Sequence, residues 1–149
     1  MFRMQIHTQI EIQASAQEVW QQLTDLASYP QWNPFILRAT GNVRTGARLN
    51  VFIKPPGSKG MTFTPIVLKA EPQKEFRWLG KFLLPKLLDA EHVFYLEKTG
   101  TNSVQLFHSE FFSGLLVPLF KRSLEGNSRA GFEAMNQALK TRVERASTL

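Results

Sequence analysis

His92, His108 and Glu110 carry the side chains of this sequence that are best suited to acid–base chemistry. An imidazole changes its charge near neutral pH, and a neighbouring carboxylate can share or accept its proton. The strands on either side of Gly100 are expected to pair about that residue. His92 then lies opposite His108, with Glu110 two residues further along on the same face. The three residues are therefore candidates for general acid and base catalysis.

Other interpretations of the same trio lead to different functions. Two histidines and a carboxylate could bind non-haem iron or zinc, but they lack the helical or loop spacing typical of such sites, so we expect no metal. The interpretation we favour is a satisfied polar pair that orients a ligand or closes the hairpin. Each of these interpretations depends on the register of the two strands that flank Gly100, because a two-residue loop would put Phe107 in the place of His108.

Hydrophobic periodicity predicts the elements that must position these side chains. Alternation over residues 6–12 predicts a first strand, and the capping box Ser15–Glu18 opens the first of a short helical pair. A long helix is expected from about Pro118 to about Arg145, with a kink at Gly126-Asn127 because glycine is a poor helix former. Between them, turn signals delimit six strands at about 35–40, 47–54, 61–69, 74–82, 88–97 and 103–112.

This order of elements indicates the α+β class. Seven strands joined by short turns are typical of an antiparallel sheet, and a helix of roughly 40 Å is long enough to lie across it. At 149 residues the chain is expected to form one domain, residues 1–149.

Composition and missing motifs exclude several functions. The net charge of +6, from 18 basic and 12 acidic residues, is not gathered into a basic run, so no nucleic acid partner is expected. The absence of cysteine suits a reducing cytosol, and no apolar run approaches the 18 or so residues of a membrane span, so we expect a cytoplasmic protein. No phosphate-binding glycine loop, HExxH, CxxC or Gly-x-Ser-x-Gly motif is present, and nothing demands a cofactor.

Several short segments, spread over nearly the whole chain, carry a family resemblance. They are Val19-Trp20, Leu23–Asp25, Tyr29–Phe35, Met61–Val67, Arg77–Gly80, Glu91–Phe94, Phe112–Leu116 and Gly131–Asn136. Together they resemble the polyketide cyclase/dehydrase branch of the START-like superfamily, often labelled SRPBCC. Because the superfamily spans lipid carriers, hormone receptors, cyclases, ubiquinone-binding proteins and chaperone activators, the resemblance is specific for fold and not for activity.

The resemblance implies a helix-grip fold, in which a curved seven-stranded sheet wraps around the C-terminal helix and encloses an apolar cavity. Small or stiff inward residues such as Pro65, Gly80 and Gly131 would leave room there. Family position adds Asn33, although an asparagine before proline more often caps a turn. The predicted ligand-binding residues are Asn33, Leu49, Val51, Phe63, Pro65, Trp78, His92, Phe94, His108, Glu110, Phe112, Gly131 and Met135.

We therefore expect a protein that binds a lipid, quinone or polyketide-like molecule in this cavity. The first alternative is a cyclase or dehydratase that uses His92, His108 or Glu110 as acid or base. The second is a lipid or quinone shuttle that docks transiently on an anionic membrane, and a homodimer is also left open. The predicted cavity rim, in an unusually apolar loop and beside it, is Leu83, Leu84, Leu87 and Leu116.

Overall fold

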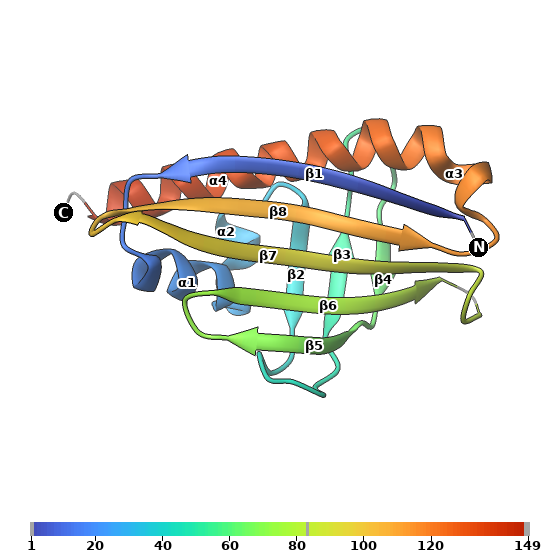
Figure 1. Cartoon of the computed structure of the whole chain (residues 1–149), viewed down its shortest axis with the longest axis horizontal. Coiled ribbons are helices and arrows are strands. Elements are labelled where there is room, and N and C mark those ends of the chain that lie inside the picture. The colour runs from blue at the N-terminus through green and yellow to red at the C-terminus, as the bar shows by residue number, and fades with distance from the viewer. Residues whose placement is uncertain (1, 83, 148–149) are drawn as a thin grey trace.

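The chain folds into two antiparallel sheets and a long C-terminal helix, as the helix-grip prediction requires (Figure 1). The structure is a computed structural model that describes residues 2–82 and 84–147. Within these ranges the larger sheet has the order β1-β8-β7-β6-β5 and the smaller sheet the order β2-β3-β4. The strands are β1 (Arg3–Ile12), β2 (Ile36–Thr40), β3 (Asn50–Ile53), β4 (Met61–Phe63), β5 (Ile66–Glu71), β6 (Glu75–Phe82), β7 (Leu88–Gly100) and β8 (Ser103–Ser113). The helices are α1 (Ala16–Thr24), α2 (Tyr29–Trp32), α3 (Val117–Ser123) and α4 (Arg129–Ser147).

The predicted single strand over 61–69 is divided in two, which corrects the expected seven-stranded sheet. Pro65 has no N–H to donate, so the ladder cannot continue through it. Before it, Phe63 pairs with Val51 of β3, and after it, Ile66 pairs with Leu79 of β6. Hydrogen bonds on either side of Pro65, including that from the Leu49 N–H to the Pro65 carbonyl at 2.8 Å, still join the two sheets. In Figure 1 the smaller sheet therefore crosses behind the larger one.

The helical pair after β1 begins as predicted. The Ser15 hydroxyl accepts from the Glu18 N–H at 3.2 Å, and the Glu18 carboxylate accepts from the Ser15 N–H at 3.2 Å. This reciprocal capping box satisfies two amide groups that would otherwise lack helical partners. It fixes α1 at the end of the molecule where α4 also ends (Figure 1).

The long helix is interrupted at the predicted place. The π-helical turn Leu124–Ser128, which contains Gly126-Asn127, separates α3 from α4. Such turns occur mostly as single insertions in α-helices and often lie at functional sites. Beyond the turn, α4 runs beside β1 (Figure 1) and buries Gly131, Phe132, Met135, Asn136, Leu139 and Val143.

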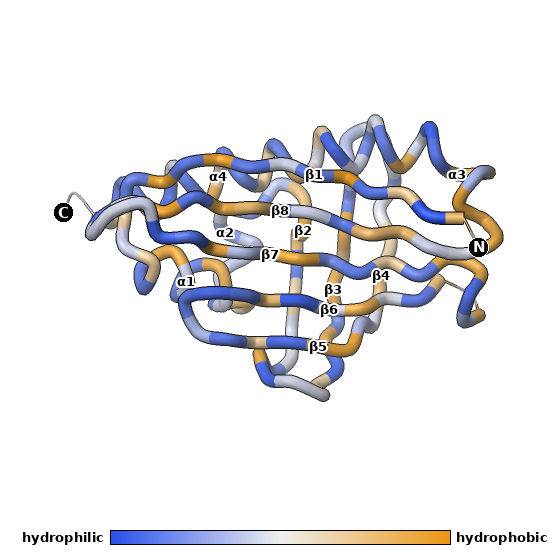
Figure 2. Tube along the Cα trace, viewed as in Figure 1, coloured by the Kyte–Doolittle hydropathy of each residue, from blue (hydrophilic) through white to orange (hydrophobic). Residues whose placement is uncertain are grey.

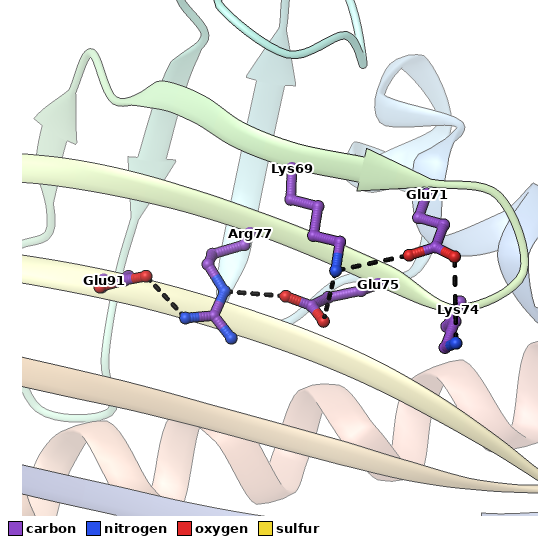
Figure 3. A network of polar contacts seen from close by, with 6 residues as sticks. All are labelled: Lys69, Glu71, Lys74, Glu75, Arg77 and Glu91. Atoms are coloured by element: carbon purple, nitrogen blue, oxygen red, sulfur yellow. Dashed lines mark hydrogen bonds and ion pairs between the residues drawn. The ribbon is translucent and has the colours of Figure 1, made fainter.

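The outer face of β5, β6 and β7 carries a network of ion pairs (Figure 3). Arg77 lies between two carboxylates, 2.9 Å from Glu75 and 2.7 Å from Glu91. Lys69 extends the network to Glu75 at 3.5 Å. Arg77 points away from the inner face, so it is not a candidate catalytic residue.

Alternation along the strands separates the core from the solvent. Figure 2 shows polar and apolar residues following one another along the strands of the larger sheet. Ile6, Phe76, Phe94 and Leu106 are fully buried on the inner face. Among the described residues, no helix is both long and apolar enough to cross a bilayer.

Candidate functional site

A cavity of about 300 Å³ lies between the two sheets and the first part of the long helix. Two of its lining residues, Lys59 and Met61, are exposed, so the cavity opens on the side of the loop that joins β3 to β4. Leu124 and Ser128 bring the π-helical turn into the wall. The apolar lining residues are Phe35, Val51, Ile53, Pro55, Met61, Phe63, Pro65, Trp78, Phe82, Leu88, Ala90, Phe112, Phe120 and Leu124.

Two glycines that were expected to leave room behave differently. A Cβ added at Gly80 would meet nothing closer than Ala90 O at 3.9 Å and Pro65 Cβ at 4.0 Å, so Gly80 borders open space. A Cβ at Gly131 would lie 2.3 Å from Cδ1 of Phe35. Gly131 is therefore a point of close packing, because the Phe35 ring fills the space that its missing side chain leaves.

The β7–β8 hairpin sets the register of the acid–base candidates, and it corrects the predicted pairing. His92 lies opposite Glu110, and His108 lies opposite Phe94. The turn is a two-residue one that alone would reverse the faces, since Gly100 pairs with Ser103. A bulge between Lys98 and Gly100 restores the parity, so both histidines and Glu110 keep the inner face.

Five polar side chains form one continuous hydrogen-bonded chain through the core. Oε2 of Glu110 lies 2.5 Å from Nδ1 of His92, and Nε2 of His92 lies 2.7 Å from Nε2 of His108. Nδ1 of His108 lies 2.7 Å from Oδ1 of Asn136, whose Nδ2 donates to the Thr8 hydroxyl at 2.9 Å. The Thr8 hydroxyl donates to the main-chain carbonyl of His108 at 2.7 Å. Both imidazoles are fully buried, and Glu110 is the member that lines the cavity.

The direction of this chain is fixed at its inner end, because a carbonyl can only accept. The single Thr8 proton goes to the His108 carbonyl, so the Thr8 oxygen accepts from Nδ2 of Asn136. Oδ1 of Asn136 then faces His108 and accepts from its Nδ1–H. A neutral His108 has a bare Nε2, which accepts from Nε2–H of His92. One proton is left for the contact between His92 and Glu110.

His108 is held in its neutral form. Burial lowers the pKa of His108 well below its ordinary value, and the neighbouring His92 lowers it further. The Phe132 ring stacks on His108 with centroids 4.3 Å apart and planes inclined by 11°. The centroid of the Phe94 ring lies 4.4 Å from that of His108. The imidazole is therefore packed between apolar rings, which cannot stabilise a positive charge as a carboxylate would.

The structure brings some of the predicted ligand-binding residues to the cavity and leaves others behind its wall. Those that line it are Val51, Phe63, Pro65, Trp78, Glu110 and Phe112. Those that are buried away from it are Leu49, Phe94, His92, His108, Gly131 and Met135. Trp78 connects the two groups, because it lines the cavity and stacks on His92 at 4.9 Å.

Asn33 lies in the core as a turn cap. Its Oδ1 accepts from the N–H groups of Phe35 and Ile36, at 3.0 and 2.8 Å. Its buried Nδ2 has no hydrogen-bond partner within the described part of the chain. Asn33 therefore positions β2 and is not among the residues that line the cavity.

The described residues of the predicted rim are not part of the cavity wall, although Phe82 and Leu88, close to them in the sequence, are. Leu84 is exposed and Leu87 and Leu116 are half-buried, and none of the three lines the cavity, while Leu83 lies outside the described residues. The loop packs on the chain after β8, since the carbonyls of Lys86 and Leu87 accept from the N–H groups of Leu115 and Leu116. The mouth residues that sequence reasoning missed are Ser58, Lys59, Gly60 and Met61. The Pro55-Pro56-Gly57 cluster before them was a signal for an irregular loop.

Asn136 and Thr8 were also missed. Asn136 follows Met135 on the side of the helix that meets the sheet, and a polar residue there needs a buried partner.

The ring nitrogens of His92 and His108 are all used in hydrogen bonds to neighbouring side chains. Residues 2–82 and 84–147 hold no group of three or more His, Asp or Glu side chains arranged for a metal ion.

Comparisons with known proteins agree with this architecture. Residues 3–144 match the sequence profile of the family described as polyketide cyclase / dehydrase and lipid transport. A comparison with curated protein sequences gave no match.

Three solved structures illustrate the likeness in fold. The Zhui aromatase/cyclase from Streptomyces sp. R1128 has a TM-score of 0.81 at 15% identity, with 98% of this chain and 96% of that chain covered. A START superfamily protein from Mycobacterium smegmatis has a TM-score of 0.74 at 22% identity, with 95% and 98% covered. The di-domain ARO/CYC StfQ from the steffimycin biosynthetic pathway has a TM-score of 0.79 at 11% identity; this chain is 99% covered but spans only 53% of that one. With the family match over residues 3–144, the chain belongs to the polyketide cyclase/dehydrase and lipid transport family.

Proposed function

We propose that this protein binds a compact hydrophobic small molecule in the cavity between its sheets. The observation that carries the proposal is an opening of about 300 Å³ whose wall is mostly apolar, with Glu110 as its one largely buried ionisable residue among those described. Small-molecule sites usually measure about 300–1,000 Å³, so this one is at the small end. The size favours a molecule of one or two rings over a long-chain lipid.

Burial of the ligand's apolar surface supplies the affinity. Roughly 300 Å² of surface removed from water contributes about 7.5 kcal/mol at about 25 cal/mol per Å², before the entropic cost of association. Trp78, Phe112 and Phe63 provide large apolar surfaces, and the two sheets hold them in place before the ligand arrives.

Native mass spectrometry of the protein purified from cells tests the proposal, together with solvent extraction of any bound species. We expect a co-purifying apolar molecule, or saturable uptake of a compact, neutral fluorescent probe such as 6-propionyl-2-(dimethylamino)naphthalene. Gly80→Val, which fills the cavity, should reduce that uptake about tenfold or more. A protein that is empty and takes up no apolar probe contradicts the binding function.

A second candidate function is catalysis of cyclisation or dehydration on a polyketide-like substrate. It is supported by Glu110, which lies in the cavity wall and shares a proton with His92. Glu110 would deliver or remove the substrate proton, and His92 would compensate for the change of charge from behind the wall. His108 would act as a positioning residue, because it contacts His92 and does not line the cavity.

Glu110→Gln tests the catalytic function, since glutamine keeps the shape and the hydrogen bonds but cannot exchange the proton. If the protein is an enzyme, turnover of a substrate analogue should fall at least about 100-fold while its affinity changes only a few-fold. Equal losses of turnover and affinity would instead assign Glu110 to ligand binding.

A third candidate is a membrane-docking shuttle, supported by one end of the molecule. We call this surface the apolar end patch: Phe2, Leu84, Leu115 and Leu119 are 54%, 65%, 63% and 74% exposed. The N-terminus, the β6–β7 turn and α3 meet there (Figure 1), and the Gly114 N–H donates to the Phe2 carbonyl. The basic residues Lys81, Lys86, Lys121 and Arg122 lie in the same segments and would attract an anionic membrane surface.

A further inference from the structure

Glu110 uses only one of its two carboxylate oxygens within the protein. Oε2 contacts Nδ1 of His92, whereas no group in the described part of the chain donates to Oε1. The Glu110 side chain lines the cavity and keeps 12% of its surface exposed. Oε1 is therefore the polar atom of the buried chain that is left for a ligand.

The proton count decides what Oε1 can do. One proton lies between His92 and Glu110, because Nε2–H of His92 is already directed at His108. If that proton is on His92, Glu110 is a carboxylate; if it is on Oε2, then Oε1 is a carbonyl oxygen. In both forms Oε1 accepts a hydrogen bond. A second proton, on Oε1, would leave a buried imidazolium without a counter-ion, which is strongly unfavourable.

The surrounding groups do not change this conclusion. Lys59 lines the cavity only at its exposed mouth. Ser58 and Ser128 also line the cavity. The Ser58 hydroxyl already donates to the Pro55 carbonyl at 2.9 Å and accepts from the Gly60 N–H at 3.2 Å, whereas the Ser128 hydroxyl can rotate to donate or accept. The atom with a fixed role is Oε1 of Glu110, in a wall that is otherwise mostly apolar.

We propose that the cavity selects a neutral ligand that bears a hydroxyl group, a phenol or an alcohol, which donates to Oε1 of Glu110. The selection rests on the proposed binding function and names the ligand class for that same cavity. A free carboxylate would place its negative oxygens against an acceptor, so fatty-acid-type anions are excluded from the inner wall. Thr8 and Asn136 are positioning residues, because they fix the direction of the chain that ends at Glu110.

Three matched probes test the selection: naphthalene, 2-naphthol and 2-naphthoate, measured at pH 7 by equilibrium dialysis with the fluorescence of the probe. We expect the wild-type protein to bind 2-naphthol about tenfold more tightly than naphthalene, the effect of one hydrogen bond in a dry site. 2-Naphthoate should bind more weakly than either. Lys59→Ala distinguishes naphthoate bound at the mouth from naphthoate bound at the inner wall, because binding that depends on the Lys59 charge is lost in that variant.

Two substitutions at Glu110 complete the test. Glu110→Gln can donate to Nδ1 of His92 and still present Oε1, so the naphthol preference should persist within about threefold while the rejection of naphthoate weakens. Glu110→Leu should bring the naphthol and naphthalene affinities to within about twofold. If the leucine variant does not fold, the affinity of the glutamine variant for naphthoate still tests whether Glu110 causes the rejection of anions.

The outcomes separate the selection from the binding function itself. Failure of all three probes to bind contradicts the proposed function. Naphthoate that binds the wild-type protein and Lys59→Ala as tightly as naphthol overturns the hydroxyl selection and leaves the binding function standing. Equal affinity for naphthol and naphthalene overturns it as well.

Discussion

Nε2 of His92 and Nε2 of His108 lie 2.7 Å apart, and both rings are fully buried. Two nitrogens at this distance need one proton between them, so the two histidines cannot have independent tautomers. At one end of the hydrogen-bonded chain, the His108 carbonyl that accepts from Thr8 determines the tautomer of His108. At the other end, this leaves one proton to be shared between His92 and Glu110. A buried polar chain of this kind is stable only when every member is satisfied.

The first prediction concerns the tautomers themselves. His108 should carry its proton on Nδ1 and His92 on Nε2, because Asn136 Oδ1 only accepts. Nitrogen-15 NMR of the imidazole rings measures this directly. Asn136→Leu should remove the preference of His108 for Nδ1–H, and a His108 that carries its proton on Nε2 in the wild-type protein would contradict the assigned direction.

The second prediction concerns the dependence of stability on pH. The pKa of His108 is lowered in the folded protein, so below about pH 6.5 the unfolded chain binds a proton that the folded chain does not. The free energy of unfolding should therefore fall as the pH is lowered from about 6.5, by about 1.4 kcal/mol per pH unit from this group.

Urea unfolding from pH 8 to pH 5 measures that slope, with His108→Gln as the comparison. The variant should be less stable at pH 8, because it disturbs the chain, but its slope below pH 6.5 should be shallower by about 1.4 kcal/mol per unit. Equal slopes in the two proteins would show that His108 takes up its proton in the folded state.

The third prediction contrasts two glycines. Gly80→Val places the valine side chain in the cavity, and valine favours a strand more than glycine does. The protein should therefore keep its stability and lose probe uptake. Gly131→Ala improves helix propensity by up to about 1 kcal/mol, but its Cβ would meet the Phe35 ring at 2.3 Å. Overpacking costs about 1–3 kcal/mol, so we expect a net loss of stability. Thermal unfolding with dye uptake distinguishes them, and the opposite pattern would place the open space at the helix.

The fourth prediction concerns the apolar end patch. Leu115→Asp with Leu119→Asp should reduce co-sedimentation with phosphatidylserine-containing vesicles several-fold, and added salt should reduce it for the wild-type protein too. Leu68→Asp is the matched control, because Leu68 is 39% exposed on β5 of the sheet, away from the patch. Wild-type protein that fails to sediment with the vesicles at any salt concentration removes the shuttle function.

Much of the fold could be predicted from local patterns. The Ser15 capping box, the alternation along β7 and β8, and the weak point at Gly126-Asn127 each depend on neighbours close in the sequence. Such effects act through short-range sterics and hydrogen bonds, so they can be read without the rest of the chain. Pro65 was read as a wall residue, but its effect on the ladder, which ends β4, was not anticipated.

The sequence by itself determined the α+β order of elements and the inward face of His92, His108 and Glu110. Only the tertiary structure decided which of them meet, because the two-residue turn and the bulge before Gly100 together move the pairing by two residues and so keep the face. It also decided that Asn136 and Thr8, 128 residues apart, bond to each other and complete the chain. Contacts between distant segments depend on how the helix packs across the sheet, and no local pattern specifies that packing.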